Sequence, residues 1–172
     1  MAKDQWPDAE ESKILHMLQE EIVIQSDRFN KERQFSPKSY GSRDLSILAY
    51  GNFYFPRTWT HMSFVLAEVL ELREWTPPRK GPLTILDLGC GSGAASLAAL
   101  RTVRDRGVEN PIELQTIDYS GKSLGYFRNL HSGLYQLWPR SKVESKRADL
   151  CGDSPNRRRN KYDLILLGSI LN

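Results

Sequence analysis

The chain has 172 residues, of which 24 are lysine or arginine and 21 are aspartate or glutamate, so its formal net charge is +3 at pH 7. Its composition, 40% hydrophobic and 26% charged, excludes a disordered chain and allows a hydrophobic core in one domain, or in one domain with an extension. A net charge this small does not by itself mark a nucleic-acid-binding protein.

Targeting and metal-binding patterns are also missing from the sequence. No apolar stretch reaches the roughly 18 residues that a membrane span needs, and the N-terminus resembles neither a secretory signal nor an arginine-rich transit peptide. The two cysteines, Cys90 and Cys151, do not have the spacing of metal ligands, and no structural disulfide is expected. We therefore expect a cytoplasmic protein with no metal and no membrane contact, or a mitochondrial one if a targeting segment has been removed.

Residues 1–76 are expected to form an N-terminal helical region. Apolar side chains at helical spacing predict a helix over residues 8–29, and the polar segment 30–41 is typical of a loop. Ser42 is expected to cap a short helix that ends at about Tyr50. After an aromatic segment, a further helix is expected over about residues 60–75.

A proline-rich linker, residues 77–82, separates this region from a domain over residues 83–172, where strands and helices alternate. The predicted strands are residues 83–88, 112–118, 142–148 and 164–167, and the predicted helices are residues 94–106 and 120–139. Repeated strand–helix units predict an α/β fold, a Rossmann-like doubly wound parallel sheet with the strand order 3-2-1-4. The lysine-rich third strand suits a sheet edge.

The predicted sheet is truncated after strand four. The fourth strand, residues 164–167, is apolar and would form an exposed edge. We therefore expect the chain to be a fragment, with the missing C-terminal strands supplied by the rest of a longer chain.

The stretch from residue 83 to residue 93 is the most informative in the chain. An apolar strand ends in an acid, Asp87, and three glycines follow at alternate positions: Gly89, Gly91 and Gly93. A helix of small residues comes next. A strand, a glycine turn and a helix start are the usual way to seat a nucleotide-like cofactor, because glycine has no Cβ to keep the backbone away from a ligand.

Charge separates the possible cofactors. Gly89, Gly91 and Ala94 also fit a dinucleotide fingerprint, but Asp87 would place a carboxylate beside the pyrophosphate. S-adenosylmethionine carries a sulfonium and an ammonium, for which an acid is favourable. Asp118 ends the next strand, where it can accept hydrogen bonds from both ribose hydroxyls, and it follows Gly89 by 29 residues. We favour S-adenosylmethionine over another nucleotide cofactor, or over a glycine turn that binds no ligand.

The order of these motifs resembles the class I S-adenosylmethionine-dependent methyltransferases over about residues 82–172. The matching positions are Asp87, Gly89, Gly91, Gly93, Asp118-Tyr119-Ser120, Ala148-Asp149-Leu150 and residues 162–167. The resemblance implies that the glycine turn, which includes Cys90, faces the methionine part of the cofactor, and that Asp118 holds the ribose beside Tyr119.

The resemblance also assigns residues after the third and fourth strands. It implies that Asp149 meets the adenine amino group with Leu150 nearby, although a turn residue or a helix cap is the alternative for Asp149. Gly168 and Ser169 follow strand four, where the family often lines the methyl-transfer site. The Asn- or Asp-Pro-Pro-aromatic motif of amino-methylating enzymes does not occur there, and no catalytic residue can be named.

A second set of motifs resembles the methyltransferase-like proteins associated with the small ribosomal subunit of bacteria and mitochondria. They are Tyr54-x-Pro56-Arg57-Thr58, Val65-Leu66-Ala67-Glu68, the linker, the glycine turn and Leu167-x-x-Ile170-Leu171-Asn172, in that order. The resemblance implies ribosomal RNA or the assembling small subunit as partner. Many members carry a cysteine metal or iron–sulfur site further along, for which this chain has no cysteines.

Candidate substrate contacts each have a simpler alternative. Arg57 could reach the cofactor carboxylate or an RNA phosphate, or be a surface arginine. Tyr54, Phe55 and Trp59 could stack on bases or belong to the core. The basic run 157–161 could meet phosphates or be a solvated loop.

The sequence is compatible with three functions. The first is methyl transfer to ribosomal RNA or the assembling small subunit. The second is a non-catalytic ribosome assembly factor that keeps the fold. The third is a small-molecule methyltransferase in which residues 1–76 act as a lid.

Overall fold

A computed structural model describes residues 7–8, 10–28, 43–72, 75–150 and 161–168. These residues fall into two compact units, one up to Pro56 and one from Arg57 onwards. The division lies within a helix, and the domain limits drawn from the sequence at residues 76 and 83 stay a prediction. In the described residues, no helix is both long enough and apolar enough to cross a membrane.

The first unit contains helix α2 (Glu11–Asp27), which confirms the helix predicted from the sequence. Its small core combines buried and half-buried side chains from α2 and the start of the next helix: Ile14, Leu18, Ile22, Leu45, Leu48 and Ala49. Beside this core the buried Glu21 accepts hydrogen bonds from Arg43 Nη2, at 2.7 and 3.0 Å, and from the Ser46 hydroxyl. These bonds give a buried carboxylate the partners it needs.

One long helix replaces the two that the sequence predicted between residues 42 and 75. Helix α3 (Asp44–Glu71) has 28 residues and carries Pro56 in its interior. The prediction ended the first helix at about Tyr50 and left the aromatic segment that contains Pro56 outside any helix; proline lacks an N–H group and usually interrupts helical hydrogen bonding. The rings of Tyr50 and Tyr54 stack one turn apart, with centroids 5.6 Å from each other, and support the helix ahead of Pro56. The expected loop at 30–41 and the Ser42 cap lie outside the described residues.

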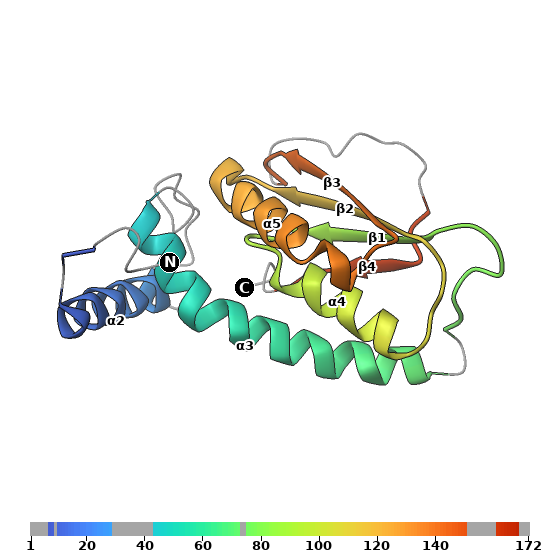
Figure 1. Ribbon diagram of the computed structural model, residues 1–172, viewed down its shortest axis with the longest axis horizontal. Helices are drawn as coiled ribbons and strands as arrows, with labels where there is room; N and C mark the ends of the chain where they lie inside the picture. The colour runs from blue at the N-terminus through green and yellow to red at the C-terminus, as the bar shows by residue number, and fades with distance from the viewer. Residues whose placement is uncertain (1–6, 9, 29–42, 73–74, 151–160, 169–172) are drawn as a thin grey trace. The chain divides into compact units, whose positions relative to one another are not determined.

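The second unit is built on a four-stranded parallel sheet (Figure 1), with the strand order β3-β2-β1-β4 predicted from the sequence. The strands are β1 (Leu83–Leu88), β2 (Ile112–Asp118), β3 (Ser141–Arg147) and β4 (Leu164–Leu166). The bounds of β1 and β2 are those predicted, β3 begins and ends one residue earlier than predicted, and β4 ends one residue earlier. The Rossmann-like fold class is thus confirmed.

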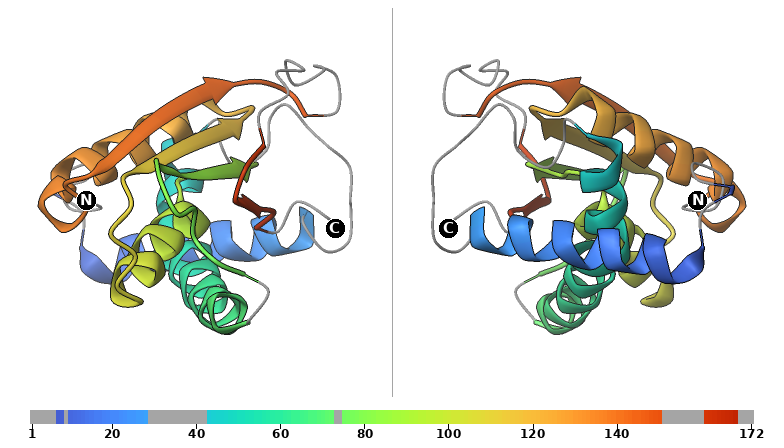
Figure 2. Two further views of the ribbon diagram at one scale, coloured as in Figure 1. Left: turned by 90° about the vertical axis from the view of Figure 1, so that its right-hand side faces the viewer. Right: turned by 90° about the vertical axis from the view of Figure 1, so that its left-hand side faces the viewer.

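Helices α4 (Ala94–Asp105) and α5 (Gly121–Gly133) lie on the same face of the sheet, as Figures 1 and 2 show. Side chains along each strand alternate between the two faces of the sheet, and buried ones such as Ile85 and Leu114 point toward these helices. The alanines of α4 let it pack closely, and Ala98, Ala99 and Leu100 are completely buried. This face holds the core that supports the glycine turn.

Helix α5 ends earlier than the sequence predicted. Ser120 caps its start, because its hydroxyl accepts a hydrogen bond from Ser123 N at 3.2 Å. The helix stops at Gly133, and a single 3-10 turn, η3 (Tyr135–Leu137), follows. The predicted helix extended to Pro139 and so included Leu134 and Leu137, but these side chains are 41% and 38% exposed. Without that burial, little favours continuing a helix beyond a glycine.

The two edges of the sheet differ in polarity. Edge strand β3 exposes lysine, glutamate and arginine side chains, which confirms its prediction as a polar edge. On the opposite edge, β4 exposes 56% of Ile165. Strand β4 is fixed to β1 by Asp163, whose Oδ2 accepts hydrogen bonds from Thr84 N and Thr84 Oγ1, each at 2.7 Å.

Candidate cofactor site at the glycine turn

Three glycines in left-handed conformations shape the turn after β1. Gly89, Gly91 and Gly93 have φ angles of 64°, 54° and 87°, which side chains with a Cβ rarely adopt. Gly89 N and Cys90 N both donate to Ile117 O, at 2.7 and 3.2 Å, so the turn is held against the end of β2. The glycine pattern is therefore required by the backbone of the turn itself.

Gly93 also makes room for a neighbouring side chain. A Cβ at Gly93 would collide with ring carbons of Phe127, a completely buried residue of α5. Gly93 N donates to Cys90 O at 2.8 Å, and Leu97 N donates to Gly93 O at 2.9 Å, which begins α4. At this position the missing Cβ serves packing within the protein, and the sequence alone did not reveal that role.

Asp118 connects the ends of two strands. Its Oδ2 accepts a hydrogen bond from Gly91 N at 2.8 Å, and its Oδ1 accepts one from Ser120 N at 2.7 Å. The side chain is only 3% exposed, and this burial raises the pKa of Asp118, an effect that the two backbone donors oppose. Each carboxylate oxygen can accept another hydrogen bond, so Asp118 can still bind a ligand hydroxyl.

Asp87 is completely buried and only partly satisfied. Its Oδ2 accepts a hydrogen bond from the Ser96 hydroxyl of α4 at 2.5 Å. Its Oδ1 has no hydrogen-bond partner in the described part of the chain. Burial raises the pKa of Asp87 to about 7, Ser96 opposes that rise and the Asp118 charge adds to it. Two buried carboxylates thus flank the glycine turn.

Two further buried groups lie in the turn. Ser92 Oγ has no hydrogen-bond partner among the described residues, and burial raises the pKa of the Cys90 thiol, which keeps it protonated. Buried polar atoms without partners are rare in folded proteins and often mark a place where a ligand or water binds. Sequence reasoning missed Ser92 and Ser96. The only available signal was a serine between two turn glycines and another in the first turn of an apolar helix.

The remaining predicted cofactor residues lie at the same end of the sheet. Tyr119 is half-buried after β2, and Asp149 and Leu150 are half-buried after β3. Ala148 N donates to Asp118 O at 3.0 Å, which brings the segment before Asp149 beside the end of β2. The fold therefore gathers the segments after β1, β2 and β3, as parallel strands require.

Gly168 follows β4 and lies against the start of α4. A Cβ there would stand 3.2 Å from Ala95 Cβ and 3.8 Å from Thr58 Cγ2. Arg57, next to Thr58, is exposed on α3 rather than placed in a loop. Ser169, Cys151 and the basic residues 157–160 lie outside the described part of the chain.

Three aromatic residues of the segment 50–60 differ in how far they are buried. Tyr54 and Phe55 are half-buried, and Trp59 is 38% exposed. All three are carried by α3. Their exposure leaves both of the sequence-based interpretations open.

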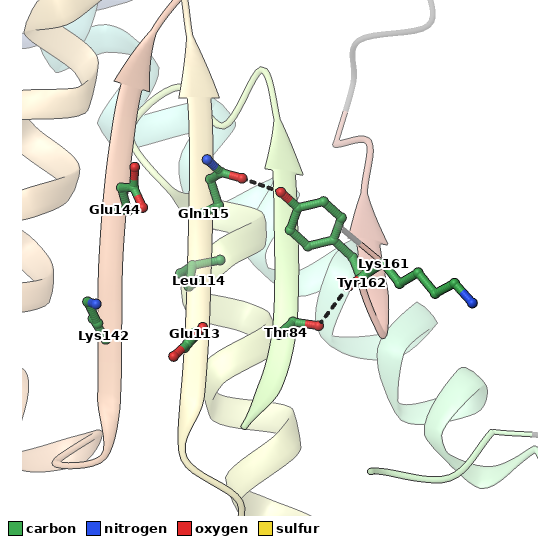
Figure 3. A pocket seen from close by; sticks show the side chains of 8 residues that line it. All are labelled: Thr84, Glu113, Leu114, Gln115, Lys142, Glu144, Lys161 and Tyr162. Atoms are coloured by element: carbon green, nitrogen blue, oxygen red, sulfur yellow. Dashed lines mark hydrogen bonds between the residues drawn. The ribbon is translucent and has the colours of Figure 1, made fainter. Parts of the chain in front are cut away.

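A separate groove lies on the sheet face opposite α4 and α5 (Figure 3). It has a volume of about 410 Å³, and its lining includes Thr84, Glu113, Gln115, Lys142, Glu144 and Tyr162. The Tyr162 hydroxyl donates to Gln115 Oε1, and the charged side chains of Glu113, Lys142 and Glu144 are exposed. Water can hydrogen-bond to these exposed groups. The described residues that line the groove therefore have no buried polar atoms without hydrogen-bond partners, whereas the glycine turn has two, Asp87 Oδ1 and Ser92 Oγ.

No family model matches the chain, and no curated protein matches its sequence. Among solved structures, the plantazolicin methyltransferase BpumL in complex with S-adenosylhomocysteine is similar over 89% of this chain and 49% of its own, with 18% identity and a TM-score of 0.42.

Two other solved structures are also similar to the chain. The S-adenosylhomocysteine-bound methyltransferase PaMTH1 of Podospora anserina has 21% identity and a TM-score of 0.35, over 76% of this chain and 41% of its own. The DszA carbon methyltransferase has 19% identity and a TM-score of 0.35, over 81% of this chain and 35% of its own. The chain spans less than half the length of each of these three proteins.

Proposed function

We propose that the chain binds S-adenosylmethionine at the glycine turn and serves as the cofactor-binding part of a methyltransferase. The observation that carries this proposal is the pair of buried carboxylates, Asp87 and Asp118, on either side of three left-handed glycines. A buried anionic site attracts a cation strongly, because little water screens the interaction. The same two charges would repel the pyrophosphate of a dinucleotide.

The residues present fit this cofactor. Asp87 offers a buried carboxylate oxygen without a partner, which suits a cationic group. Asp118 has lone pairs left for the ribose hydroxyls, and Asp149 and Leu150, the candidates for the adenine, directly follow Ala148, whose N donates to Asp118 O. When bound, the cofactor supplies a methyl group on a sulfonium. The chain's part is to orient that group and keep water away, so that proximity lowers the barrier.

For the methyl acceptor we propose ribosomal RNA or the assembling small ribosomal subunit. The support is the order of motifs around Pro56 and Arg57, ahead of the glycine turn, together with the exposure of Arg57 and Trp59 on α3. A small-molecule acceptor and a non-catalytic role in ribosome assembly are the competing possibilities. The three possibilities differ in what they require. An RNA methyltransferase needs both RNA binding and methyl transfer, an assembly factor needs RNA binding alone, and a small-molecule methyltransferase needs methyl transfer without RNA.

Calorimetric titration with S-adenosylmethionine tests the cofactor proposal. We expect saturable binding by the folded chain, and loss of binding in Asp118→Ala, which removes the ribose acceptor and a support of the turn. Glu113→Gln, an exposed carboxylate on the same strand, is the matched control and keeps full affinity. Circular dichroism establishes that each variant is folded. A folded wild-type chain that does not bind would refute the proposal.

Transfer of a radiolabelled methyl group tests the acceptor. The chain is incubated with labelled S-adenosylmethionine and either purified small ribosomal subunits or a mixture of small metabolites. We expect label in ribosomal RNA, and RNA binding that weakens steeply as salt is raised. Label in small molecules alone would favour the third function. Salt-dependent RNA binding without any transfer would favour the assembly factor.

A further inference from the structure

Asp87 has a property that binding a cofactor does not by itself explain. Its side chain is 0% exposed, and Oδ1 has no partner among the described residues, while Oδ2 is held by Ser96. An ionised carboxylate in such a place is costly unless it is paired with a cation. The Asp87 carboxylate therefore needs a counter-charge both before and after a ligand binds.

The groups around Asp87 do not balance it. From β2 comes a second acid, Asp118, and from the turn comes the Cys90 thiol, whose own pKa is raised by burial and by both acids. Ser96 of α4 is neutral, and Leu166, the register partner on β4, is apolar. In the described part of the chain, no salt bridge involves Asp87 or Asp118.

A proton is then the available counter-charge in the free protein. Desolvation and the neighbouring acid both favour the neutral form of Asp87, and its pKa accordingly lies at about 7. At neutral pH the group is thus balanced between its two forms. Any cation that enters the site shifts this balance toward the carboxylate.

We propose that Asp87 is a proton-linked cation acceptor, which holds a proton in the free protein and releases it when a cationic group of the ligand binds. The O–H bond of the carboxylic acid breaks, the proton passes to the buffer, and the carboxylate pairs with the cation. No other bond changes. The inference rests on the proposed binding of S-adenosylmethionine and adds to it a regulation of affinity by pH.

The ligand has two cations that Asp87 could accept. S-adenosylmethionine carries both a sulfonium and an ammonium, whereas its demethylated product, S-adenosylhomocysteine, keeps the ammonium and has a neutral sulfur. If the sulfonium releases the proton, only the methyl donor does so, and the site distinguishes donor from product. If the ammonium releases it, both ligands do so equally.

Titration calorimetry in two buffers tests the proposal. The wild-type chain is titrated with each ligand at pH 7, in phosphate and in Tris, whose ionisation enthalpies differ, and the difference in heat gives the protons released. We expect about half a proton per bound S-adenosylmethionine, because a group with a pKa of about 7 is half protonated at pH 7. The dissociation constant should fall roughly five- to tenfold per pH unit from pH 5 to pH 7 and level off above.

Two variants separate proton linkage from a merely structural role. Asp87→Asn keeps an oxygen for Ser96 but cannot ionise, so proton release and the pH dependence of affinity should both disappear. Ser96→Ala removes a donor that favours the carboxylate, so the midpoint of the affinity profile should move to higher pH and more protons should be released at pH 7. If Asp87 and Ser96 had only a structural role, the substitutions would not change the number of protons released on binding. Glu113→Gln is the matched control and should behave as wild type.

Each outcome bears on the proposal. Equal heats in the two buffers, with an affinity independent of pH and still lost in Asp118→Ala, would refute the proton linkage and leave cofactor binding intact. No binding by folded wild type at any pH would refute both. If Asp87→Asn fails to fold, the wild-type heats and the Ser96→Ala profile still decide the matter.

Discussion

Acidic side chains lie both at the glycine turn and in the groove on the opposite sheet face, but in different surroundings. Asp87 and Asp118 at the turn are 0% and 3% exposed. Glu113 and Glu144 in the groove are exposed, and Lys142 stands opposite Glu113 on the neighbouring strand (Figure 3). Water satisfies the second pair at little cost, whereas the first pair depends on hydrogen bonds, protons or a ligand. The same chemical group therefore points to function only where burial makes it expensive.

The two places also differ in how much a substitution should matter. At the turn, a substituted side chain contacts closely packed neighbours or a charge that water does not screen. In the groove, it meets water and flexible side chains. The free energy of unfolding should consequently respond strongly to changes at the turn and weakly to changes in the groove.

The largest effect is expected from Gly93→Ala. The new Cβ would collide with the buried Phe127 ring, and the residue would have to keep a φ of 87°. Overpacking and left-handed strain together should lower the free energy of unfolding by about 4 kcal/mol. Chemical denaturation of the wild-type and variant chains measures the difference.

Two comparisons sharpen this prediction. Gly125→Ala in α5 is the matched control, because its Cβ would meet nothing within 4 Å, and it should stabilise the chain by about 0.5–1 kcal/mol. In the double variant Gly93→Ala with Phe127→Leu, the smaller side chain should relieve part of the collision. Additive losses in that double variant would argue against the contact as the cause.

The next effect is a pH dependence caused by Asp87. Because burial raises its pKa from 3.8 to about 7, the folded chain keeps a proton that the unfolded chain releases. The free energy of unfolding should therefore fall as pH rises from about 4 to about 7, and remain level above that. The Asp87→Asn variant cannot ionise at this position and lacks this loss. Between about pH 4 and about pH 7, its free energy of unfolding relative to wild type should therefore rise by on the order of a few kcal/mol.

Denaturation midpoints at pH 5 and pH 8 test this dependence in the ligand-free chain. The difference between variant and wild type isolates Asp87 from other groups, including His131, whose pKa is lowered by burial. A difference that is the same at both pH values would show that Asp87 is already ionised, or already neutral, throughout the window.

Much of the second unit could be predicted from the sequence, because its signals are local. Apolar strands bounded by glycine and proline gave the bounds of β1 and β2, and the order of strand–helix units predicted the strand order. Asp118 was expected at the end of β2, and it stands there beside the glycine turn. These features depend on backbone preferences that a few neighbouring residues decide.

What the sequence did not reveal depends on contacts between distant residues. The Ser96 bond to Asp87 and the fit of Phe127 against Gly93 join different elements, so no local pattern encodes them. The aromatic segment between about residues 50 and 60 was predicted to separate two helices, yet α3 continues through it. Likewise the helix predicted over residues 120–139 ends at Gly133, and Leu134, which follows it, is 41% exposed.

A smaller effect is expected where β4 joins β1. Asp163→Ala removes an acceptor for two hydrogen bonds from Thr84, at an exposed position on the edge of the sheet. The free energy of unfolding should fall by about 1 kcal/mol, because exposed donors can turn to water instead. Asp163→Asn keeps an oxygen acceptor and should retain most of the stability. Hydrogen exchange of the β4 amides would show whether the loss is confined to this edge.

The smallest effect is expected in the groove, from Glu113→Gln. Glu113 stands opposite Lys142 in the register of β2 and β3, and an exposed cross-strand pair of this kind contributes about 0.5 kcal/mol or less. The contribution of this pair to the free energy of unfolding should vanish at 1 M salt, where exposed charges are screened within roughly 3 Å. The Asp87 effect should persist in the same salt, because counter-ions do not reach a buried carboxylate. Denaturation of both variants at low and high salt therefore tests whether burial separates the two groups of acids. A salt-sensitive Asp87 effect would mean that the glycine turn is open to solvent.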